Sequence, residues 1–385
     1  MKDQHKNKSN KKYHIIIVLT FLVLLFVLTI ADIITQDKFK SENENRILQQ
    51  NPEFTINRLF NGQYTKEYEN YISDQFILRD NWISLKVKTD QIMLKKDING
   101  VYIGKDNYLL EKHNKNDIET EQLQLNINRL TQMCDKYKDK NIRIMMVPSA
   151  AAILSEKLPD FAPFYDDNKI TEMIKSQLND KNIILDTASI LQEHKDEYIY
   201  YKTDHHWTSL GAYYAYTQWA QSIGITPLNQ SEFDIKILSD EFYGTIHSKL
   251  NINTHADTIK AYYPKNKIDY TIKYNLENKQ YDTVYNMDAL KTKDKYSVFL
   301  NGNNAIAQIS TNIDNNRNLL IIRDSFANCF VPFALNHFEN ISVIDLRYYN
   351  AGIEQYINDN NITDILILYN TIKFAQDKNT SGLMK

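Results

Sequence analysis

The sequence predicts an α/β protein with a doubly wound parallel sheet, a β-rich insertion and one N-terminal transmembrane helix. Amphipathic helical segments alternate with short apolar runs along residues 98–385, a pattern typical of parallel sheets covered by helices. Residues 230–315 instead contain period-two segments such as DTIKAYYP and KYSVFLNG, which favour antiparallel strands. Residues 15–34 are almost wholly apolar and are long enough to cross a bilayer as a helix.

The N-terminal region carries the signals of a membrane anchor. Residues 1–13 contain five lysines, and mixed charges follow the apolar run. The positive-inside rule therefore predicts a cytoplasmic tail over 1–13, a single-pass anchor over 14–35 and an extracellular remainder. The alternative is a signal peptide cleaved near Ala31. Because the apolar run continues through Ile33 and Ile34, we favour the uncleaved anchor, and in both cases the main part of the chain is exported.

Residues 36–97 have the composition of a polar, mainly helical juxtamembrane segment. Pro52 and Gly62 interrupt the helical pattern. Aromatic residues, among them Tyr68 and Trp82, suggest one apolar face. We expect this segment to pack on the domain that follows and to hold that domain away from the lipid.

Strand and helix signals alternate from residue 98 onwards. Residues 98–111 predict short strands with a turn at 104–107. Apolar residues then recur from Leu123 to Tyr137 at intervals of four, three, four and three, which predicts an amphipathic helix. The further predicted elements are a buried strand ending at Pro148, a helix over 169–178, a strand over 182–186, a helix capped by Gly224, and three closing strands within 318–325, 339–350 and 363–371.

Charge and composition argue against several classes of partner and cofactor. The formal net charge of −3 gives no basis for bulk electrostatic binding to nucleic acid. The chain shows no glycine-rich phosphate cradle and no basic cluster suited to a nucleotide. Its two cysteines, Cys134 and Cys329, do not have the spacing of metal ligands. We therefore expect no nucleic acid partner and no nucleotide or metal cofactor.

Two stretches far apart in the chain carry groups suited to acyl-ester chemistry. TDHHW supplies Asp204 and His206, and NLLIIRDSF places Ser325 directly after an apolar strand. A serine hydroxyl needs a base to take its proton, and the base needs a carboxylate to fix its tautomer. In extended backbone, side chains two residues apart lie on the same side. We therefore expect Asp204 to reach His206 while His205 points the other way.

Simpler interpretations exist for each of these residues. Ser325 can act as the cap of the helix that follows it. Asp204, His205 and His206 can together ligate a metal ion. Such a site needs further ligands, however, and the sequence contains no H-x-x-x-H pattern or second acidic cluster nearby. The triad interpretation is therefore preferred to a metal site.

The segments TDHHWTSLGAYYAY, RDSFAN and FYGTIHSKLN resemble those of the DHHW family of exported Gram-positive proteins. More distantly, they resemble the alginate O-acetyltransferase proteins of the SGNH-hydrolase-like group. The resemblance extends from SENENRIL near Ser41 to the last strand. It implies an SGNH-like fold and a triad of Asp204, His206 and Ser325. The chain order Asp, His, Ser is that of the acetyltransferase group, whereas standard SGNH hydrolases have Ser first.

The resemblance also points to donors for an oxyanion hole. In SGNH enzymes an Asn that follows a later strand contributes, and Asn370, at the end of ILILYN, is the corresponding residue here. Arg347 and the backbone of Gly302 are further candidates. The SGNH pattern has Gly before Asp324-Ser325, but this chain has Arg323, which leaves the shape of the oxyanion hole open.

The combined features predict a membrane-anchored extracellular O-acyl transferase, with acetyl as the expected group and a polysaccharide hydroxyl as the acceptor. A carbohydrate-ester hydrolase with the same triad is one alternative, because only the acceptor differs. A non-enzymatic cell-surface protein with a decayed site is another. The resemblance to alginate-type proteins further implies a membrane-bound, multi-span acyltransferase as partner, because an exported site has no access to cytoplasmic acyl-CoA.

Overall fold

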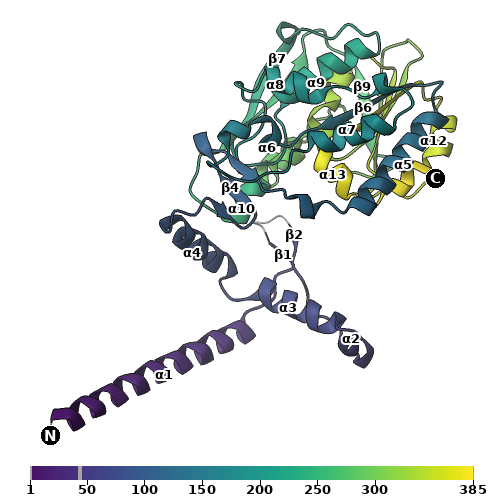
Figure 1. The fold of residues 1–385 in the computed structure, drawn as a ribbon. Coiled ribbons are helices and arrows are strands. Elements are labelled where there is room, and N and C mark those ends of the chain that lie inside the picture. The colour runs from purple at the N-terminus through teal and green to yellow at the C-terminus, as the bar shows by residue number, and fades with distance from the viewer. Residues whose placement is uncertain (1, 42–45, 385) are drawn as a thin grey trace. The chain divides into compact units, whose positions relative to one another are not determined.

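The computed structural model describes residues 2–41 and 46–384, and Figure 1 shows how they fold. Residues 42–45, which belong to the SENENRIL stretch, lie outside the described part. The chain forms two compact units, residues 1–90 and 91–385. All candidate site residues from the sequence belong to the second unit.

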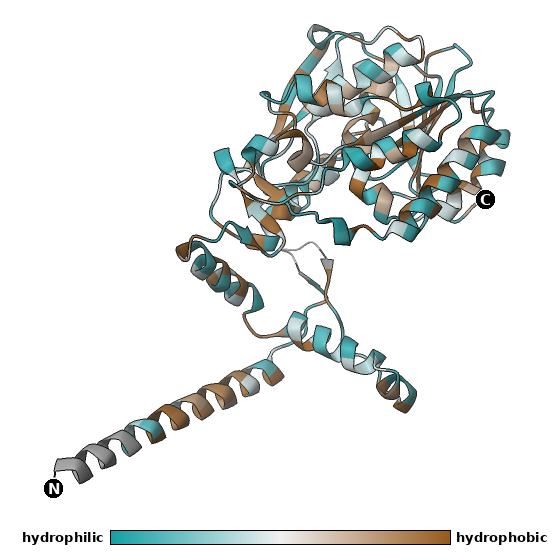
Figure 2. Cartoon of the chain, viewed as in Figure 1, coloured by the Kyte–Doolittle hydropathy of each residue, from teal (hydrophilic) through white to brown (hydrophobic). Residues whose placement is uncertain are grey.

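The first unit is mainly helical. Its first helix, α1 (Lys2–Ile34), contains a stretch from Lys12 to Ile34 that is long and apolar enough to cross a membrane. The apolar side chains of this stretch are mostly exposed, and the ribbon of this helix carries the hydrophobic colour along most of the stretch in Figure 2. Gly62, with a φ of 78°, separates two of the following helices. The other elements are β1 (Lys40–Ser41), β2 (Arg46–Ile47), α2 (Ile56–Phe60), α3 (Gln63–Gln75) and α4 (Arg79–Ile92).

A six-stranded sheet with the order β6-β13-β11-β12-β10-β9 forms the centre of the second unit. The first four strands of this order are parallel, β10 runs antiparallel to β12, and β9 runs antiparallel to β10. The α/β class is therefore confirmed, but the sheet is mixed; a doubly wound, SGNH-like topology remains a prediction. The strands are β6 (Asn141–Val147), β9 (Tyr270–Tyr274), β10 (Ile306–Thr311), β11 (Asn318–Arg323), β12 (Asn340–Ile344) and β13 (Asp364–Asn370).

Alternate residues of each central strand enter two separate hydrophobic cores, one on each face of the sheet. In β11, Leu319 and Ile321 join one core while Leu320 and Ile322 join the other. Strand side chains alternate between faces, so a strand buried on both sides must be apolar throughout. This requirement explains the uninterrupted apolar run LLII in β11 and accounts for the correct prediction of the three closing strands.

Helices cover both faces of this sheet (Figure 1). One core contains side chains of α9 and α11, and the other contains side chains of α5, α7, α12 and α13. The helices predicted over 119–137, over 169–178 and after TDHHW correspond to α5, α7 and α9. The helix bounds are α5 (Thr120–Lys136), α6 (Ala150–Ile153), α7 (Asn168–Gln177), α8 (Thr187–Glu193), α9 (Ser209–Ser222), α10 (Thr245–Leu250), α11 (Val331–Ala334), α12 (Ile353–Asp359) and α13 (Thr371–Gln376).

The remaining strands form two small antiparallel sheets. β3 (Asp97–Ile98), β4 (Val101–Ile103) and β5 (Leu109–Glu111) form the first, and β7 (Phe233–Phe242) and β8 (Asp257–Pro264) form the second. The segment DTIKAYYP forms β8 as predicted, but the strand predicted at KYSVFLNG is wrong, because Lys295–Val298 forms a short 3-10 helix and only Phe299 pairs, through a single bridge to Tyr285. β9 and β10 extend the central sheet. The alternation of side chains in the sequence predicts a strand but not the strand with which it pairs. The addition of β9 and β10 to the central sheet could therefore not be predicted.

The strand predicted over 182–186 is wrong. Only Ile184 pairs, through a single parallel bridge to Ile144. Two residues later the side chain of Asp186 accepts a hydrogen bond from the backbone N–H of Ser189 at 3.1 Å and caps α8. The chain therefore turns into a helix before a ladder can form.

Candidate active site

The loop that carries the TDHHW motif is shaped by a buried carboxylate. Tyr200 and Trp207 form an antiparallel bridge that closes the loop. Asp257, at the start of β8, accepts hydrogen bonds from the backbone N–H groups of Lys202 and Thr203 at 2.8 and 2.7 Å, and from the Thr203 hydroxyl at 2.5 Å. Burial raises the pKa of the Asp257 carboxyl group. No local pattern indicates this role of Asp257, because Asp257 lies more than fifty residues downstream of the loop.

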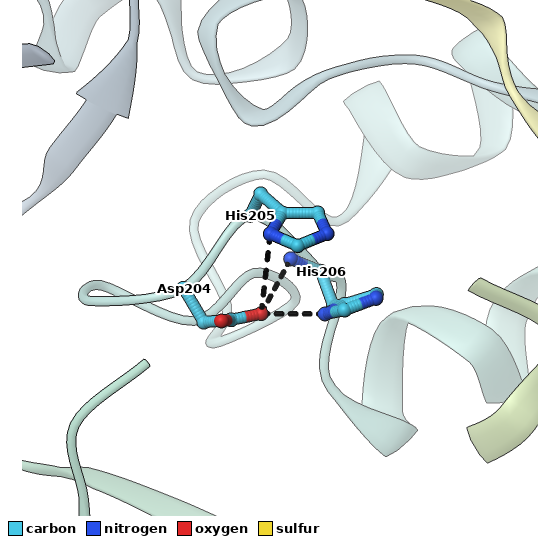
Figure 3. Close-up of side chains that lie close together, drawn as sticks. All are labelled: Asp204, His205 and His206. Carbon is cyan, nitrogen blue, oxygen red and sulfur yellow. Dashed lines mark hydrogen bonds and ion pairs between the residues drawn. The ribbon is translucent and has the colours of Figure 1, made fainter. Parts of the chain in front are cut away.

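Asp204 and His206 meet through a bend and not through extended backbone. Oδ1 of Asp204 accepts from the backbone N–H of His206 at 3.0 Å and lies 2.5 Å from Nδ1 of its ring (Figure 3). The predicted extended geometry is therefore wrong, although the predicted pair forms. The same bend brings the ring of His205 to a centroid distance of 3.9 Å from the ring of His206. The expectation that His205 points the other way is thus also wrong.

The second oxygen of Asp204 is held by α10. Oδ2 accepts from the backbone N–H and the hydroxyl of Thr245, at 2.8 and 3.0 Å. Gly244 allows this approach, since a Cβ atom there would lie 2.2 Å from the Cβ of Asp204. Burial alone would raise the pKa of Asp204, but the charges of His205 and His206 and these hydrogen bonds hold it well below its ordinary value. The FYGTIH stretch, which contains Gly244 and Thr245, is part of the family resemblance. Nothing in its local sequence predicts that these residues hold the carboxylate of Asp204.

Ser325 lies where β11 leaves the carboxyl edge of the central sheet. Its Oγ is 2.7 Å from Nε2 of His206. The helix cap at this turn is Asp324, whose Oδ1 accepts from the backbone N–H of Phe326 at 2.9 Å. The simpler interpretation, in which Ser325 is the helix cap, is therefore wrong, because Asp324 caps the helix. As the first residue of a short helix (Ser325–Cys329), Ser325 has a backbone N–H without an intrahelical partner, and no other acceptor is recorded for it within the described chain.

Aromatic side chains fix the orientation of His206 and of the Ser325 turn. The ring of Tyr296 stacks on His206 at a centroid distance of 3.8 Å and an interplanar angle of 11°. Its hydroxyl donates to the backbone carbonyl of Ser325 at 3.2 Å. Trp207 donates from Nε1 to the carbonyl of Phe326 at 2.9 Å. Tyr296 could not be selected from the sequence, because 26 tyrosines occur in the chain and nothing in its local pattern distinguishes it.

The three candidate donors for the oxyanion hole differ in how many of their N–H groups already make hydrogen bonds within the protein. Asn370 donates from Nδ2 to the carbonyl of Val147 at 3.1 Å, so one of the two amide hydrogens has a partner. The backbone N–H of Gly302 donates to the carbonyl of Phe299 at 3.0 Å within a turn. Arg347 donates from Nε and Nη2 to Asp345, at 2.9 and 2.6 Å.

Arg323, which occupies the position of the expected glycine, takes no part in the Ser325 turn through its side chain. The guanidinium is fully buried, with Nη1 at 2.9 Å from Oδ1 of Asn303 and 3.5 Å from a carboxylate oxygen of Asp345. Burial lowers the pKa of this guanidinium. Arg323 therefore connects the end of β11 to the chain after β12.

Asp204, His205 and His206 also form a cluster of possible metal ligands, with ligand atoms within 4.8 Å of one another. Each of these residues already makes a short contact to a protein group. Nδ1 of His206 is engaged by Asp204, and Nδ1 of His205 lies 2.7 Å from the Thr245 hydroxyl. A metal ion in this cluster would have to displace these hydrogen bonds. The donor set is therefore better suited to orienting His206 than to binding a metal.

A family model described as "DHHW protein" matches residues 96–344. The chain belongs to the DHHW family. A solved DHHW family protein from Eubacterium siraeum is 27% identical, with a TM-score of 0.64 over 74% of this chain and 95% of that chain. PatB1 of Bacillus cereus is 21% identical, with a TM-score of 0.61 over 71% of this chain and 96% of that chain. This second likeness shows the shared fold alone.

One curated relative of this DHHW protein is the probable alginate O-acetylase AlgJ of Pseudomonas fluorescens. The two are 27% identical over 179 residues, which is 44% of this chain and 45% of AlgJ. The chain thus spans less than half the length of this curated relative. The relationship to the alginate O-acetylase group that the motifs suggested is confirmed.

A small pocket lined by both polar and apolar side chains adjoins the Ser325 turn at the carboxyl edge of the sheet. Ser149 lines this pocket, and its backbone N–H donates to Oδ2 of Asp167 at 2.7 Å. Asp167 is fully buried, and its Oδ1 has no hydrogen-bond partner in the described chain. Burial raises the pKa of Asp167 to about 6.

Asp167 should make stability fall as pH rises from about 4 to 6. In this window the folded chain keeps a proton on Asp167 that the unfolded chain has released, so folding is favoured most at the acid end. Relative to Asp167→Asn, the wild-type free energy of unfolding should drop by about 3 kcal/mol across the window and then level off. Urea unfolding at pH 4, 5, 6 and 7 measures this difference. A difference that does not change with pH, or the same change in Asp314→Asn at an exposed site, would contradict the assignment.

Proposed function

We propose that this DHHW protein is an O-acyltransferase that moves an acyl group, with acetyl the expected one, to a hydroxyl of a cell-surface or exported polysaccharide. The observation that carries the proposal is the continuous hydrogen-bonded series from Asp204 through His206 to Ser325, with contacts of 2.5 and 2.7 Å. The name of the Pseudomonas fluorescens relative, a probable alginate O-acetylase, supports the same reaction. An SGNH-like arrangement of the sheet belongs to this proposal.

In the first half-reaction, Oγ of Ser325 attacks the carbonyl carbon of the donor ester. His206 takes the serine proton on Nε2, and Asp204 holds Nδ1–H and stabilises the imidazolium that forms. The bond to the donor oxygen then breaks, and that oxygen receives the proton from His206. The products are the deacylated donor and an acyl ester on Ser325.

In the second half-reaction, His206 removes a proton from the acceptor hydroxyl while that oxygen attacks the Ser325 ester. The bond between the acyl carbon and Oγ breaks, and Oγ recovers the proton. The same residues would hydrolyse the ester if water took the place of the glycan. Exclusion of water from the site therefore decides between transfer and hydrolysis.

The oxyanion of each tetrahedral intermediate needs donors that are not already engaged. The backbone N–H of Ser325 meets this condition within the described chain, as does the second amide hydrogen of Asn370. The N–H of Gly302 and the paired guanidinium edge of Arg347 meet it less well, because they donate to Phe299 and Asp345. We therefore assign the oxyanion contact to Ser325 and Asn370.

Ser325→Ala and His206→Ala should each abolish most of the transfer. A general base contributes typically 10²–10⁴-fold, and loss of the nucleophile removes the acyl ester altogether. The measurement is O-acetyl content of cell-envelope polysaccharide in cells that carry each variant, together with covalent labelling of the purified chain by a sulfonyl fluoride. Wild-type acetylation in the Ser325→Ala cells would overturn the proposal, as would equal labelling of Ser325→Ala and the wild type.

We also propose that α1 anchors the protein, with residues 1–13 in the cytoplasm and the second unit outside. The apolar stretch from Lys12 to Ile34 supports this placement, and the lysines before it favour this orientation. Protease added to intact cells should then remove the chain beyond residue 40. Protection of that region in intact cells, with cleavage only after lysis, would reverse the orientation. Release into the medium, without protease, of a chain shortened by cleavage near Ala31 would indicate a signal peptide instead.

The acyl donor is proposed to be a membrane-embedded, multi-span acyltransferase and not a soluble thioester. An anchored site is confined to the membrane surface, which raises its effective concentration near such a partner. Residues 36–97 would then set the height of Ser325 above the lipid. Polysaccharide O-acetylation should appear when the chain is co-expressed with a multi-span acyltransferase and not when it is expressed alone. Full-rate acetylation of glycan by the purified chain from acetyl-CoA would refute this partner.

A further inference from the structure

The hydroxyl of Thr245 touches two groups although it holds a single hydrogen. Its Oγ1 lies 3.0 Å from Oδ2 of Asp204 and 2.7 Å from Nδ1 of His205. An ionised carboxylate can only accept, so the hydroxyl donates to Asp204 and accepts from His205. His205 must therefore carry a hydrogen on Nδ1.

This arrangement leaves Nε2 of His205 as a hydrogen-bond acceptor. Burial, and then the positive charge of His206, lower the pKa of His205 to about 4, so the ring is neutral at physiological pH. A neutral imidazole with a hydrogen on Nδ1 has a free lone pair on Nε2. No hydrogen-bond partner for this nitrogen is recorded in the described chain. A ligand hydroxyl is the group that fits it.

His205 lines the small pocket at the carboxyl edge of the sheet. The pocket adjoins the Ser325 turn, because Phe326 also lines it and because the neighbouring Asn370 donates its backbone N–H to Asp324 at 2.9 Å. In an open α/β sheet, ligands bind at this edge. The polar lining consists of Glu111, His113, Ser149, His205, Asn370 and Lys373.

The charges in this pocket favour a ligand rich in hydroxyl groups. Glu111 is a second acceptor: burial alone would raise its pKa, but His113, His205 and Lys249 hold the pKa well below its ordinary value. Its Oε1 accepts from Lys249 at 2.7 Å, so the carboxylate is fixed. Lys373, which also lines the pocket, supplies a donor. Sugar hydroxyls both donate and accept, so they can satisfy both kinds of group.

We propose that this pocket is the acceptor subsite and that Nε2 of His205 accepts a hydrogen bond from a glycan hydroxyl next to the one that receives the acyl group. The two adjacent histidines then have separate tasks: His206 moves the proton of Ser325, and His205 selects a glycan over water as acceptor. This inference rests on the proposed acyl transfer at Ser325 and adds the recognition of its acceptor.

Two substitutions of His205 distinguish a role in binding the glycan from a structural role in holding Thr245 against Asp204. In His205→Gln the side-chain amide reaches the place of Nε2 and can accept from the glycan, but the bond to Thr245 is lost. In His205→Asn the shorter amide can donate to Thr245 in place of Nδ1, but nothing reaches the pocket. A structural role therefore predicts that Asn is the better replacement, and a recognition role predicts that Gln is.

The experiment uses the full chain and two readouts. Acylation of Ser325 is followed by the burst of p-nitrophenol from p-nitrophenyl acetate with the detergent-purified protein. Transfer is followed by the O-acetyl content of cell-envelope polysaccharide in cells carrying the same variant. In His205→Asn, transfer should fall about ten-fold more than acylation, the cost of one lost hydrogen bond. His205→Gln should recover a large part of the transfer. His255→Ala, at an exposed site, should leave both readouts unchanged.

The outcomes keep this inference separate from the proposed function. Parallel loss of acylation and transfer in His205→Asn, or better transfer with Asn than with Gln, would overturn the acceptor role of His205. Unchanged transfer in both variants would overturn it as well. Absence of a burst in the wild type, or wild-type transfer in Ser325→Ala, would instead remove the acyl-transfer proposal itself.

Discussion

The buried carboxylate of Asp204 is the constraint on which the site depends. A charge that is 2% exposed is costly unless hydrogen bonds replace its hydration, and Asp204 receives them from His206 and Thr245. Two of these hydrogen bonds come from the backbone N–H groups of His206 and Thr245, so the backbone itself holds the carboxylate in place. The orientation of His206 follows, because its Nδ1 can meet Oδ1 in only one ring position. Ser325 then lies against the other nitrogen of the ring.

This constraint explains why distant segments must converge around the TDHHW loop. Asp257 holds the start of the loop, Gly244 lets the backbone of α10 approach Asp204, and Tyr296 stacks on the ring of His206. None of these groups performs proton transfer in the proposed mechanism. They hold the donor and acceptor atoms in place before substrate arrives, so little reorganisation is needed during the reaction. The stretch between α9 and β11, which reads as an insertion, supplies all three.

The sequence predicted the central strands and the reactive group because those features are local. Apolar runs buried on both faces predict strands, and a serine directly after one of them is placed at the sheet edge. Asp204 and His206 were found through their spacing, although the backbone bends between them where extended backbone was expected. Thr245 and Asp257 were missed because their roles are tertiary contacts across about 40 and 50 residues of chain. For Gly302 and Arg347, the hydrogen bonds that their donors already make could not be predicted from the sequence.

The bend also changes what the second histidine can do. In extended backbone His205 would face away from Asp204, and its identity would matter little to the site. In the bend its ring lies against His206, and the Thr245 hydroxyl links it to the same carboxylate. Because the Thr245 hydroxyl has one hydrogen and donates it to Asp204, it must accept from Nδ1–H of His205. This tautomer leaves the lone pair on Nε2 of His205 as a hydrogen-bond acceptor. A single buried carboxylate thus orients two imidazoles: one through a direct contact and one through a hydroxyl.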